Sequence, residues 1–534
     1  MGIYDISFFQ KNKRMKTSLA AAFVLSMVAH AYSYFNSSFA TDRFRWFGHY
    51  TVRGLNGAAM GKWFGQYLGF LNWNSYLPWL NGLIATAYLA FSVWIVCEVL
   101  DVKKTLSIIL IAGLMVTDSC VIMANFFTPQ GFLLALITAC ISVWFWHNDK
   151  LKFPVRIAGE AVFISFSLGT YGSYTTVAPT LVILACMVML LQGEGVVKVL
   201  KRGGEYIASF LAGMGLYYVI LRLCLKFQKI EMLSYLGEDK LVTGTDSNEL
   251  LYCIEIGYKN SIARYLGDYR GKYRVMPQWM AILMLVCGAA MIALLLWNND
   301  RMKKNKWSYV LLLALIAVFP LSAGAIYVMA FGTVHHLMVY TYVMLYVGFV
   351  KLAEMIGADR LYKDWRKQAA VIMSGIMIAC SVFVVYKGIL VSNMCYSRLD
   401  NLNTVSEGIA FRLLDRIESC EGFTGDESVC FVGDVTDSEY FKNSRYSDSD
   451  WLDMLDGIIA VSPDRSNVFI YYTHLIMFMQ EYTETDLDME YYDPDSEVLS
   501  SQDKQIIEDM PLFPADGSVR KIGGQVIVKF SEDD

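Results

Sequence analysis

The chain of 534 residues is too long for one ordinary soluble domain. Hydrophobic residues make up 55% of it and charged residues only 18%, whereas soluble domains carry roughly 25% charged residues. This composition, with a mean hydropathy of +0.39, excludes an ordinary soluble protein and indicates a membrane protein.

The charge is divided unevenly along the chain. From Tyr396 onward there are 30 Asp and Glu against 10 Lys and Arg, a net charge of −20. Because the whole chain carries −5, the first 395 residues carry +15. We therefore predict a basic membrane domain, 1–395, followed by an acidic soluble domain, 396–534. We expect membrane lipid around the first domain and no nucleic-acid partner.

Eleven cysteines are present, and no two of them form a C-x-x-C pair. Most lie in apolar segments, where a thiol behaves as a small hydrophobic group. Cys253, Cys395, Cys420 and Cys430 lie outside those segments. A bridge between Cys420 and Cys430 stays open, since spacing alone is weak support for a disulfide.

Apolar segments long enough to cross about 30 Å of hydrocarbon recur through the first domain. We predict eleven transmembrane helices, and so a polytopic α-helical membrane protein. The segments are 17–36, 78–100, 105–124, 130–147, 155–172, 176–192, 206–225, 278–297, 308–330, 336–352 and 369–392.

Lysines and arginines gather in alternate loops, whereas the short loops 125–130, 173–175 and 331–335 have none. Since cytoplasmic loops carry the excess of Lys and Arg, this pattern places the N-terminus in the cytoplasm. Eleven crossings then place the loops 37–77 and 226–277 and the C-terminal domain outside. The first segment could instead be a secretory signal cleaved near Ala31, which would leave the orientation unchanged.

The first outer loop is unusual in its charges and its glycines. Asp42 follows the first apolar segment closely and is itself followed by Arg43 and Arg45. We favour a functional role for this acid over a structural one. The glycines at 57, 61, 65 and 69 would form one stripe of a helix, which predicts an interfacial helix pressed closely against another surface.

Further polar side chains collect on the predicted outer side. The long loop 226–277 interleaves tyrosines with arginines, which suits sugar stacking and phosphate binding. The alternative is an aromatic belt at the membrane interface with snorkelling arginines. The other outer candidates are Arg53, Lys62 and Trp63 in the first loop, Asp118 and Asn125 at the second turn, Tyr171 to Tyr174 at the third, and His335 and His336 at the fifth.

Common catalytic motifs for nucleotide hydrolysis, dinucleotide redox chemistry and proteolysis are absent. Acids near the predicted spans are few, with Glu98, Asp118 and Glu160 the main ones. Ion-coupled transporters usually carry more carboxylates near the bilayer midplane. Glu160 stays open as a structural or a pathway residue.

The tail from residue 396 reads as a mixed α/β domain. Residues 428–433 predict a buried strand, and 468–483 predict an apolar helix. Residues 519–530 predict a hairpin that turns at Gly523 and Gly524.

The order of these features resembles membrane glycosyltransferases of the GT-C class, and most closely the phage-type O-antigen glucosyltransferase family with its Gram-positive relatives. That family's first loop carries an acidic pair and then a Gly-Arg-Trp element. Here Thr41 and Asp42 stand in the place of the pair, and Gly61, Lys62 and Trp63 stand in the place of the element. Segments 167–171, 333–340 and 508–519 also resemble the family.

The resemblance implies transfer of a hexose, glucose, from a polyprenyl-phosphate donor to a surface glycan outside the bacterial plasma membrane. Asp42 would be the general base, and cationic groups would hold the lipid phosphate. A divalent metal can take part in this class, but the sequence shows no ligand set that commits to one, so no metal ligand is assigned and metal dependence stays open. The implied substrate-binding residues are Arg43, Arg45, Arg53, Lys62, Trp63, Asp118, Tyr171, His335 and His336.

Two other functions stay open at this point. One is a non-enzymatic transporter or assembly factor for lipid-linked glycans, and the other is a glycan polymerase or ligase of similar topology. A transporter would spread polar residues through its spans, whereas this sequence concentrates them on one face, which favours the transferase.

Overall fold

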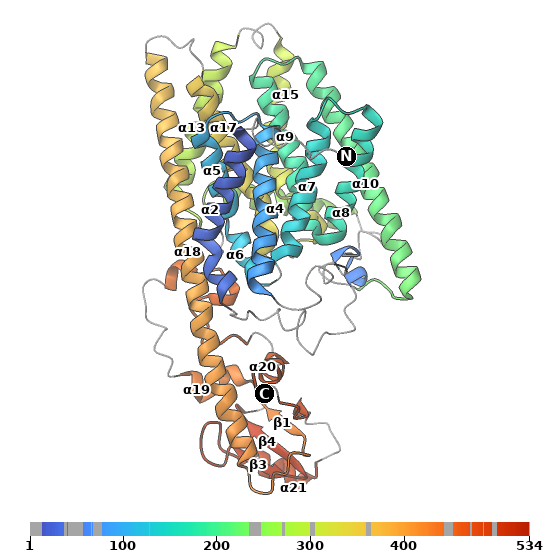
Figure 1. The fold of residues 1–534 in the computed structure, drawn as a ribbon, viewed down its shortest axis with the longest axis vertical. Coiled ribbons are helices and arrows are strands. Elements are labelled where there is room, and N and C mark those ends of the chain that lie inside the picture. Colours follow the sequence, from blue (N-terminus) through green and yellow to red (C-terminus); the bar gives the residue numbers. More distant parts are fainter. Residues whose placement is uncertain are drawn as a thin grey trace, which may run out of the picture. The chain divides into compact units, whose positions relative to one another are not determined.

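The computed structural model describes most of the chain. The described residues are 13–36, 40, 57–65, 67, 77–127, 129–233, 247–269, 273–299, 305–358, 365–442, 452–469, 473–483, 485–493 and 499–532. They form two compact units: the first takes the described residues of Met1–Phe35 and Gly54–Asn393, and the second those of Asn36–Arg53 and Met394–Asp534. Figure 1 shows a helical first unit and a second unit that contains the strands.

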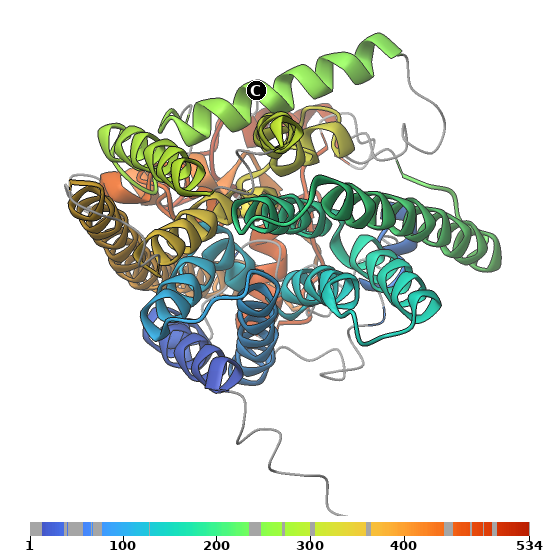
Figure 2. The same ribbon diagram turned by 90° about the horizontal axis from the view of Figure 1, so that it is seen from above.

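The described part of the first unit consists mainly of helices, which Figure 2 shows from above. All eleven predicted segments fall on helices. These are α2 (Lys13–Phe35), α4 (Pro78–Val99), α5 (Thr105–Val116), α6 (Ser119–Phe126), α7 (Pro129–His147), α8 (Phe153–Thr175), α9 (Val177–Leu191), α10 (Val196–Gln228), α13 (Gln278–Asn298), α15 (Lys306–Ala323), α16 (Ile326–Met329), η4 (His336–Tyr342), α17 (Val343–Ala358) and α18 (Trp365–Glu418).

Eight of the described helices are long and apolar enough to cross a membrane, and counting two bent pairs as one span each raises the number to ten. The chain is therefore a polytopic, mostly helical protein of the membrane type. The prediction of eleven spans is not reproduced. The difference lies at α8 and α9, which meet at 77° and which the sequence pattern treats as two spans. With 15 residues, α9 is only about 22 Å long, short of a full crossing.

The loop predicted at 226–277 is partly helical. Residues Ser247–Tyr265 form α12, in which Cys253, Gly257, Ser261 and Arg264 are buried. Successive members of this set are three or four residues apart, so they share one face of α12, which packs against the rest of the unit. The segment is too polar on its other face to be found by a search for apolar runs.

Ion pairs form at the loops that carry the lysines and arginines. Arg14 of α2 pairs with Glu98 at 2.8 Å and with Asp101 at 2.7 Å. Lys351 and Glu354 pair inside α17 at 3.1 Å, and both side chains are about 4% exposed. Glu98 therefore has a structural role in this fold.

Glu160 is fully buried on α8 and accepts a hydrogen bond from Ser209 of α10. This contact joins two helices that are packed along their length. Nearby, Arg156 of α8 pairs with Glu205 of α10 at 2.6 Å. The surroundings of Glu160 thus favour the structural alternative over the pathway one.

The second unit contains a four-stranded mixed sheet in the order β2-β1-β4-β3. The buried strand predicted at 428–433 is present as β1 (Val429–Val432), and the predicted hairpin is present as β3 (Val519–Ile522) and β4 (Gln525–Lys529), paired antiparallel. The strand β2 (Met489–Tyr491), parallel to β1, was not predicted. The predicted apolar helix is present as α20 (Thr473–Thr483). Cys420 and Cys430 are free thiols, so the bridge left open above is not formed.

Candidate functional site

Four of the predicted site residues, Asp42, Arg43, Arg45 and Arg53, lie outside the described residues. The other six are described. They belong to segments far apart in the chain: Lys62 and Trp63 after the first helix, Asp118 between α5 and α6, Tyr171 in α8, and His335 and His336 at the start of η4.

The predicted glycine-striped helix is wrong for its described part. Residues Gly57–Met60 form a single 3₁₀ turn, η2, which ends at Gly61. Gly61 has φ +74°, its N–H donates to Ala58 at 3.0 Å, and the N–H of Lys62 donates to Gly57 at 2.7 Å. This pair of bonds is the Schellman motif, which needs a left-handed residue just past the helix end. Gly61 therefore ends a helix rather than lining one.

Trp63 fixes this segment onto α8. Its indole is 6% exposed and contacts the rings of Phe64 and Phe166. The N–H of Phe64 donates to the carbonyl of Gly169 at 2.8 Å. A Cβ atom at Gly169 would lie 2.4 Å from the Trp63 ring, so this close contact requires a residue without a side chain. The visible contacts of Trp63 are thus packing contacts.

Lys62 lies over an aromatic ring of α8. Its Nζ atom is 5.2 Å from the centroid of the Tyr171 ring. The turn predicted at residues 171–174 is wrong, because these residues lie inside α8. Tyr171 has φ −158° and ψ 96°, so it marks a kink in that helix. The kink turns the Tyr171 side chain against Phe132 at a ring distance of 4.7 Å.

A row of tyrosine rings leads from Lys62 to the break between α5 and α6. Tyr171 lies 5.8 Å from Tyr174, and Tyr174 stacks on Tyr340 at 5.4 Å. The hydroxyl of Tyr340 donates to the carbonyl of Met115, at the end of α5, at 2.9 Å. Tyr174 and Tyr340 are fully buried, so of these three rings Tyr171 alone is partly exposed and could offer a face on which a sugar stacks.

Asp118 lies in the break itself. It is the N-cap of α6 and accepts a hydrogen bond from the N–H of Cys120 at 2.9 Å. Asp118 and Asn125 do not mark the predicted second turn, because Asp118 lies where α5 and α6 meet at a bend of 45° and Asn125 is buried inside α6. The carboxyl group is close enough to Tyr174, Tyr340 and Arg264 to interact with them electrostatically.

The two histidines have different surroundings. His336 is 3% exposed, and a hydrogen bond of 2.6 Å joins its Nε2 to the hydroxyl of Ser119. The thiol of Cys120 donates to the His336 carbonyl at 3.2 Å. His335 is exposed and makes no capping hydrogen bond through its side chain. Only His336 therefore joins the residues around Asp118.

Lys62 and Tyr171 thus lie at one end of this row of rings, and Asp118 and His336 lie near its other end, at the break between α5 and α6. A carboxylate, a cation and tyrosine faces are groups that suit proton transfer, phosphate neutralisation and sugar stacking. Among the described residues, no group of three or more His, Cys, Asp or Glu side chains could hold a metal ion.

The sequence pattern missed several members of this group. Ser119, Tyr174 and Tyr340 contact the predicted residues without having been singled out themselves. Tyr174 and Tyr340 do lie in the segments 171–174 and 333–340 that drew attention. No sequence signal distinguishes Ser119, whose role depends on a partner 217 positions away.

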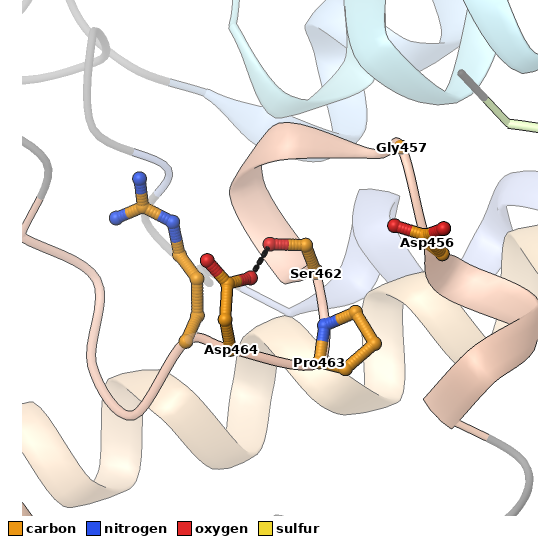
Figure 3. A pocket seen from close by; sticks show the side chains of 6 residues that line it. Asp456, Gly457, Ser462, Pro463 and Asp464 are labelled. Atoms are coloured by element: carbon orange, nitrogen blue, oxygen red, sulfur yellow. Dashed lines mark hydrogen bonds between the residues drawn. The ribbon is translucent and has the colours of Figure 1, made fainter. Parts of the chain in front are cut away.

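Figure 3 shows a pocket of the second unit, lined by Asp456, Gly457, Ser462, Pro463, Asp464 and Arg465. Three of these side chains make local hydrogen bonds: Ser462 donates to Asp464, and Arg465 donates to the carbonyl of Phe469 at 2.9 Å. We assign no ligand to this pocket.

Comparison with known proteins gives one result. A family model described as Glucosyl transferase GtrII matches residues 31–353, which is more than half of the chain. The matched region includes Lys62, Asp118, Tyr171 and His336. No curated protein and no solved structure matches the chain.

Proposed function

Because the chain belongs to the GtrII glucosyl transferase family, we propose that it transfers glucose from a polyprenyl-phosphate-linked donor to a cell-surface glycan. Apart from the family match, the best support is the row of tyrosine rings in the matched region, which has Lys62 and Tyr171 at one end and Asp118 and His336 near the other. We place the reaction at the outer face of a bacterial plasma membrane, with the donor's lipid chain in the surrounding bilayer.

In the proposed reaction a carboxylate removes the proton from an acceptor hydroxyl. The hydroxyl oxygen then forms a bond to the anomeric carbon of glucose, and the bond between that carbon and the phosphate oxygen breaks. The lipid phosphate leaves with the electron pair, and nearby cations offset its charge. Asp42 is the proposed base and Asp118 the second candidate. Arg43, Arg45, Arg53 and Lys62 are the proposed cations, with Trp63, Tyr171, His335 and His336 completing the substrate-binding set.

Residues 1–395 are the proposed catalytic domain. Residues 396–534 are the proposed extracytoplasmic domain. The support for this orientation is the distribution of Lys and Arg, which places the N-terminus in the cytoplasm. An odd number of crossings would place the second unit outside, and an even number would place it inside.

The two carboxylates can be separated by substitution. Asp42→Asn and Asp118→Asn remove proton acceptance, and loss of a general base typically costs about 10²–10⁴-fold in rate. Asparagine is also a good N-cap, so Asp118→Asn should leave α6 intact. Asp426→Asn, at an exposed position of the second unit, is the matched control.

We expect purified Asp42→Asn protein to fold, to bind donor lipid and to lose sugar transfer, while the Asp426→Asn control transfers at the wild-type rate. Full activity of Asp42→Asn together with loss in Asp118→Asn would move the base to Asp118. Full activity of both would remove the proposed mechanism.

The function itself is tested in cells. Deleting the gene should remove glucose from the surface glycan and leave the glycan backbone in place, as measured by mass spectrometry. Loss of the whole glycan would instead indicate an assembly factor, a polymerase or a ligase.

A further inference from the structure

Arg264 is a buried arginine that the mechanism above does not use. It lies in the last turn of α12 and is 9% exposed. The helix ends just beyond it, because Gly267 has φ +80° and its N–H donates to the carbonyl of Arg264 at 3.0 Å, while Asp268 donates to Ala263 at 2.9 Å. This second Schellman motif turns the chain back and brings Tyr269 over Arg264.

Two tyrosine rings hold the guanidinium group. Its central carbon is 5.3 Å from the centroid of Tyr269 and 5.0 Å from that of Tyr342. The hydroxyl of Tyr342 is in turn joined to the hydroxyl of Ser261, one turn earlier on α12, at 2.9 Å. Stacking on ring faces orients the plane of the guanidinium while using none of its N–H donors.

The donors of Arg264 have no acceptor in the part of the chain that the structure describes: no hydrogen bond and no ion pair to this side chain is present there. Asp118 attracts it electrostatically without forming an ion pair with it. Burying a charge is unfavourable unless the charge is paired and hydrogen-bonded. An oriented, buried guanidinium without acceptors is therefore prepared for an anion from outside the chain.

The position of Arg264 is also fixed by contacts made one and two turns earlier on the same face of α12. A Cβ atom at Gly257 would lie 2.9 Å from the carbonyl oxygen of Gly324, just after α15, and a Cβ atom at Gly324 would lie 2.4 Å from the hydroxyl of Ser261. The backbones touch at this point, so α12 cannot slide along its neighbour without a clash.

We propose that Arg264 anchors a phosphate-binding site. Guanidinium groups bind phosphate through two parallel hydrogen bonds, and this fork explains why an arginine is held flat here. For the phosphate of a polyprenyl carrier the assignment rests on the proposed function, and free inorganic phosphate has the same chemistry. A cation in the last turn of a helix also interacts favourably with the helix dipole, but that effect requires neither burial nor stacking on two rings.

The test uses the full-length protein in lipid nanodiscs. Arg264→Lys keeps the charge at the helix end and removes the fork, and Arg264→Gln removes both. The matched controls are Arg222→Lys and Arg222→Gln, because Arg222 also stacks on a tyrosine, Tyr218, at 5.1 Å, but on the exposed surface of α10. Gel filtration and thermal unfolding check that every variant is folded.

The probes are polyprenyl phosphate, the corresponding polyprenol without phosphate, and inorganic phosphate. We expect Arg264→Lys to bind polyprenyl phosphate at least about tenfold more weakly than wild type and Arg264→Gln more weakly still. A tenfold change corresponds to about 1.4 kcal/mol. Binding of polyprenol should be weak and equal in all variants, and the Arg222 variants should match wild type.

An effect of Arg264 on inorganic phosphate as large as on the lipid would support the site and assign it to free phosphate. Equal affinity of wild type and both Arg264 variants for both phosphate probes would overturn the proposal. The result is independent of whether sugar is transferred. A protein that transfers glucose with an unchanged donor KM in Arg264→Lys would keep the proposed function and lose this site.

Discussion

The hydroxyl of Ser119 and Nε2 of His336 lie 2.6 Å apart and join the first turn of α6 to η4. Both residues are almost fully buried, and Ser119 directly follows Asp118 in the chain. The bond therefore helps to hold the break between α5 and α6 against a segment from the far end of the first unit.

Ser119→Ala should destabilise the protein. It removes the partner of His336 Nε2 in a buried place, and an unsatisfied buried group costs about 1–3 kcal/mol. Ser381→Ala is the matched control, because Ser381 is equally buried and its hydroxyl donates to the Met377 carbonyl of its own helix at 2.8 Å. Urea unfolding of both variants in detergent gives the comparison. Equal stability of the two would show that the Ser119 bond contributes nothing specific.

Substitution of Gly61 should lower the stability of the protein, because the backbone at this position has the left-handed conformation that glycine tolerates best. An L-residue in the left-handed region costs roughly 1–2 kcal/mol, and asparagine tolerates that region best, so Gly61→Ala should destabilise more than Gly61→Asn. Gly204→Ala is the control, since a Cβ atom there meets nothing within 4 Å, and it should stabilise α10 by about 1 kcal/mol. Thermal unfolding measures all three. A Gly61→Ala protein as stable as wild type would contradict the described turn.

The helices of the first unit could be predicted because an apolar run of membrane length is a strong local signal. Their bends could not, since distant partners set them. The break before Asp118 is held by the bond from Tyr340 to Met115, and the bend at Thr176 by a hydrogen bond between the hydroxyls of Thr176 and Thr341.

The same limit applies to the site. The sequence indicated Lys62, Asp118, Tyr171 and His336 one by one, from residue type and place in the chain. The contacts that connect them form between different helices, and the spacing of residues in the sequence does not reveal which helices pack together. Arg264 was indicated only as one of the arginines interleaved with tyrosines in the predicted loop 226–277. Its helix, α12, was not predicted, because the segment is too polar to resemble a span.

Glu427 should make the second unit more stable at neutral than at acid pH. A hydrogen bond from Lys521 at 2.6 Å, with others from the main chain of Thr424 and Gly425, lowers the pKa of this carboxyl from 4.5 to about 2. A lowered folded pKa adds stability that is complete above pH 4.5 and is lost as the pH falls towards 2.

Hydrogen exchange of the strands in the full-length protein measures this effect. Wild type should exchange more slowly than Glu427→Gln at pH 7, and the difference should shrink as the pH falls below 4.5. A difference that is the same at every pH would mean that the charge of Glu427 plays no part.

Labelling of an introduced cysteine can determine on which side of the membrane the second unit lies. Asp426→Cys places one at an exposed site, in a Cys420→Ser background that removes the partly exposed native thiol of this unit. We expect an impermeant maleimide to label this variant on intact cells whose outer barriers have been removed. Labelling only after lysis would place the unit in the cytoplasm and make the number of crossings even.

The contact between Gly257 and Gly324 affects which positions a mutational screen of this protein would identify as important for function. Neither glycine has a side chain that could touch a substrate, yet any replacement at either position would push α12 away from its neighbour and displace Arg264. A random screen for lost function would therefore recover both positions as often as true contact residues. These two positions could be recognised because a second substitution would not restore function. Backbone atoms already fill the space between the helices, so no smaller side chain nearby could make room for a larger residue.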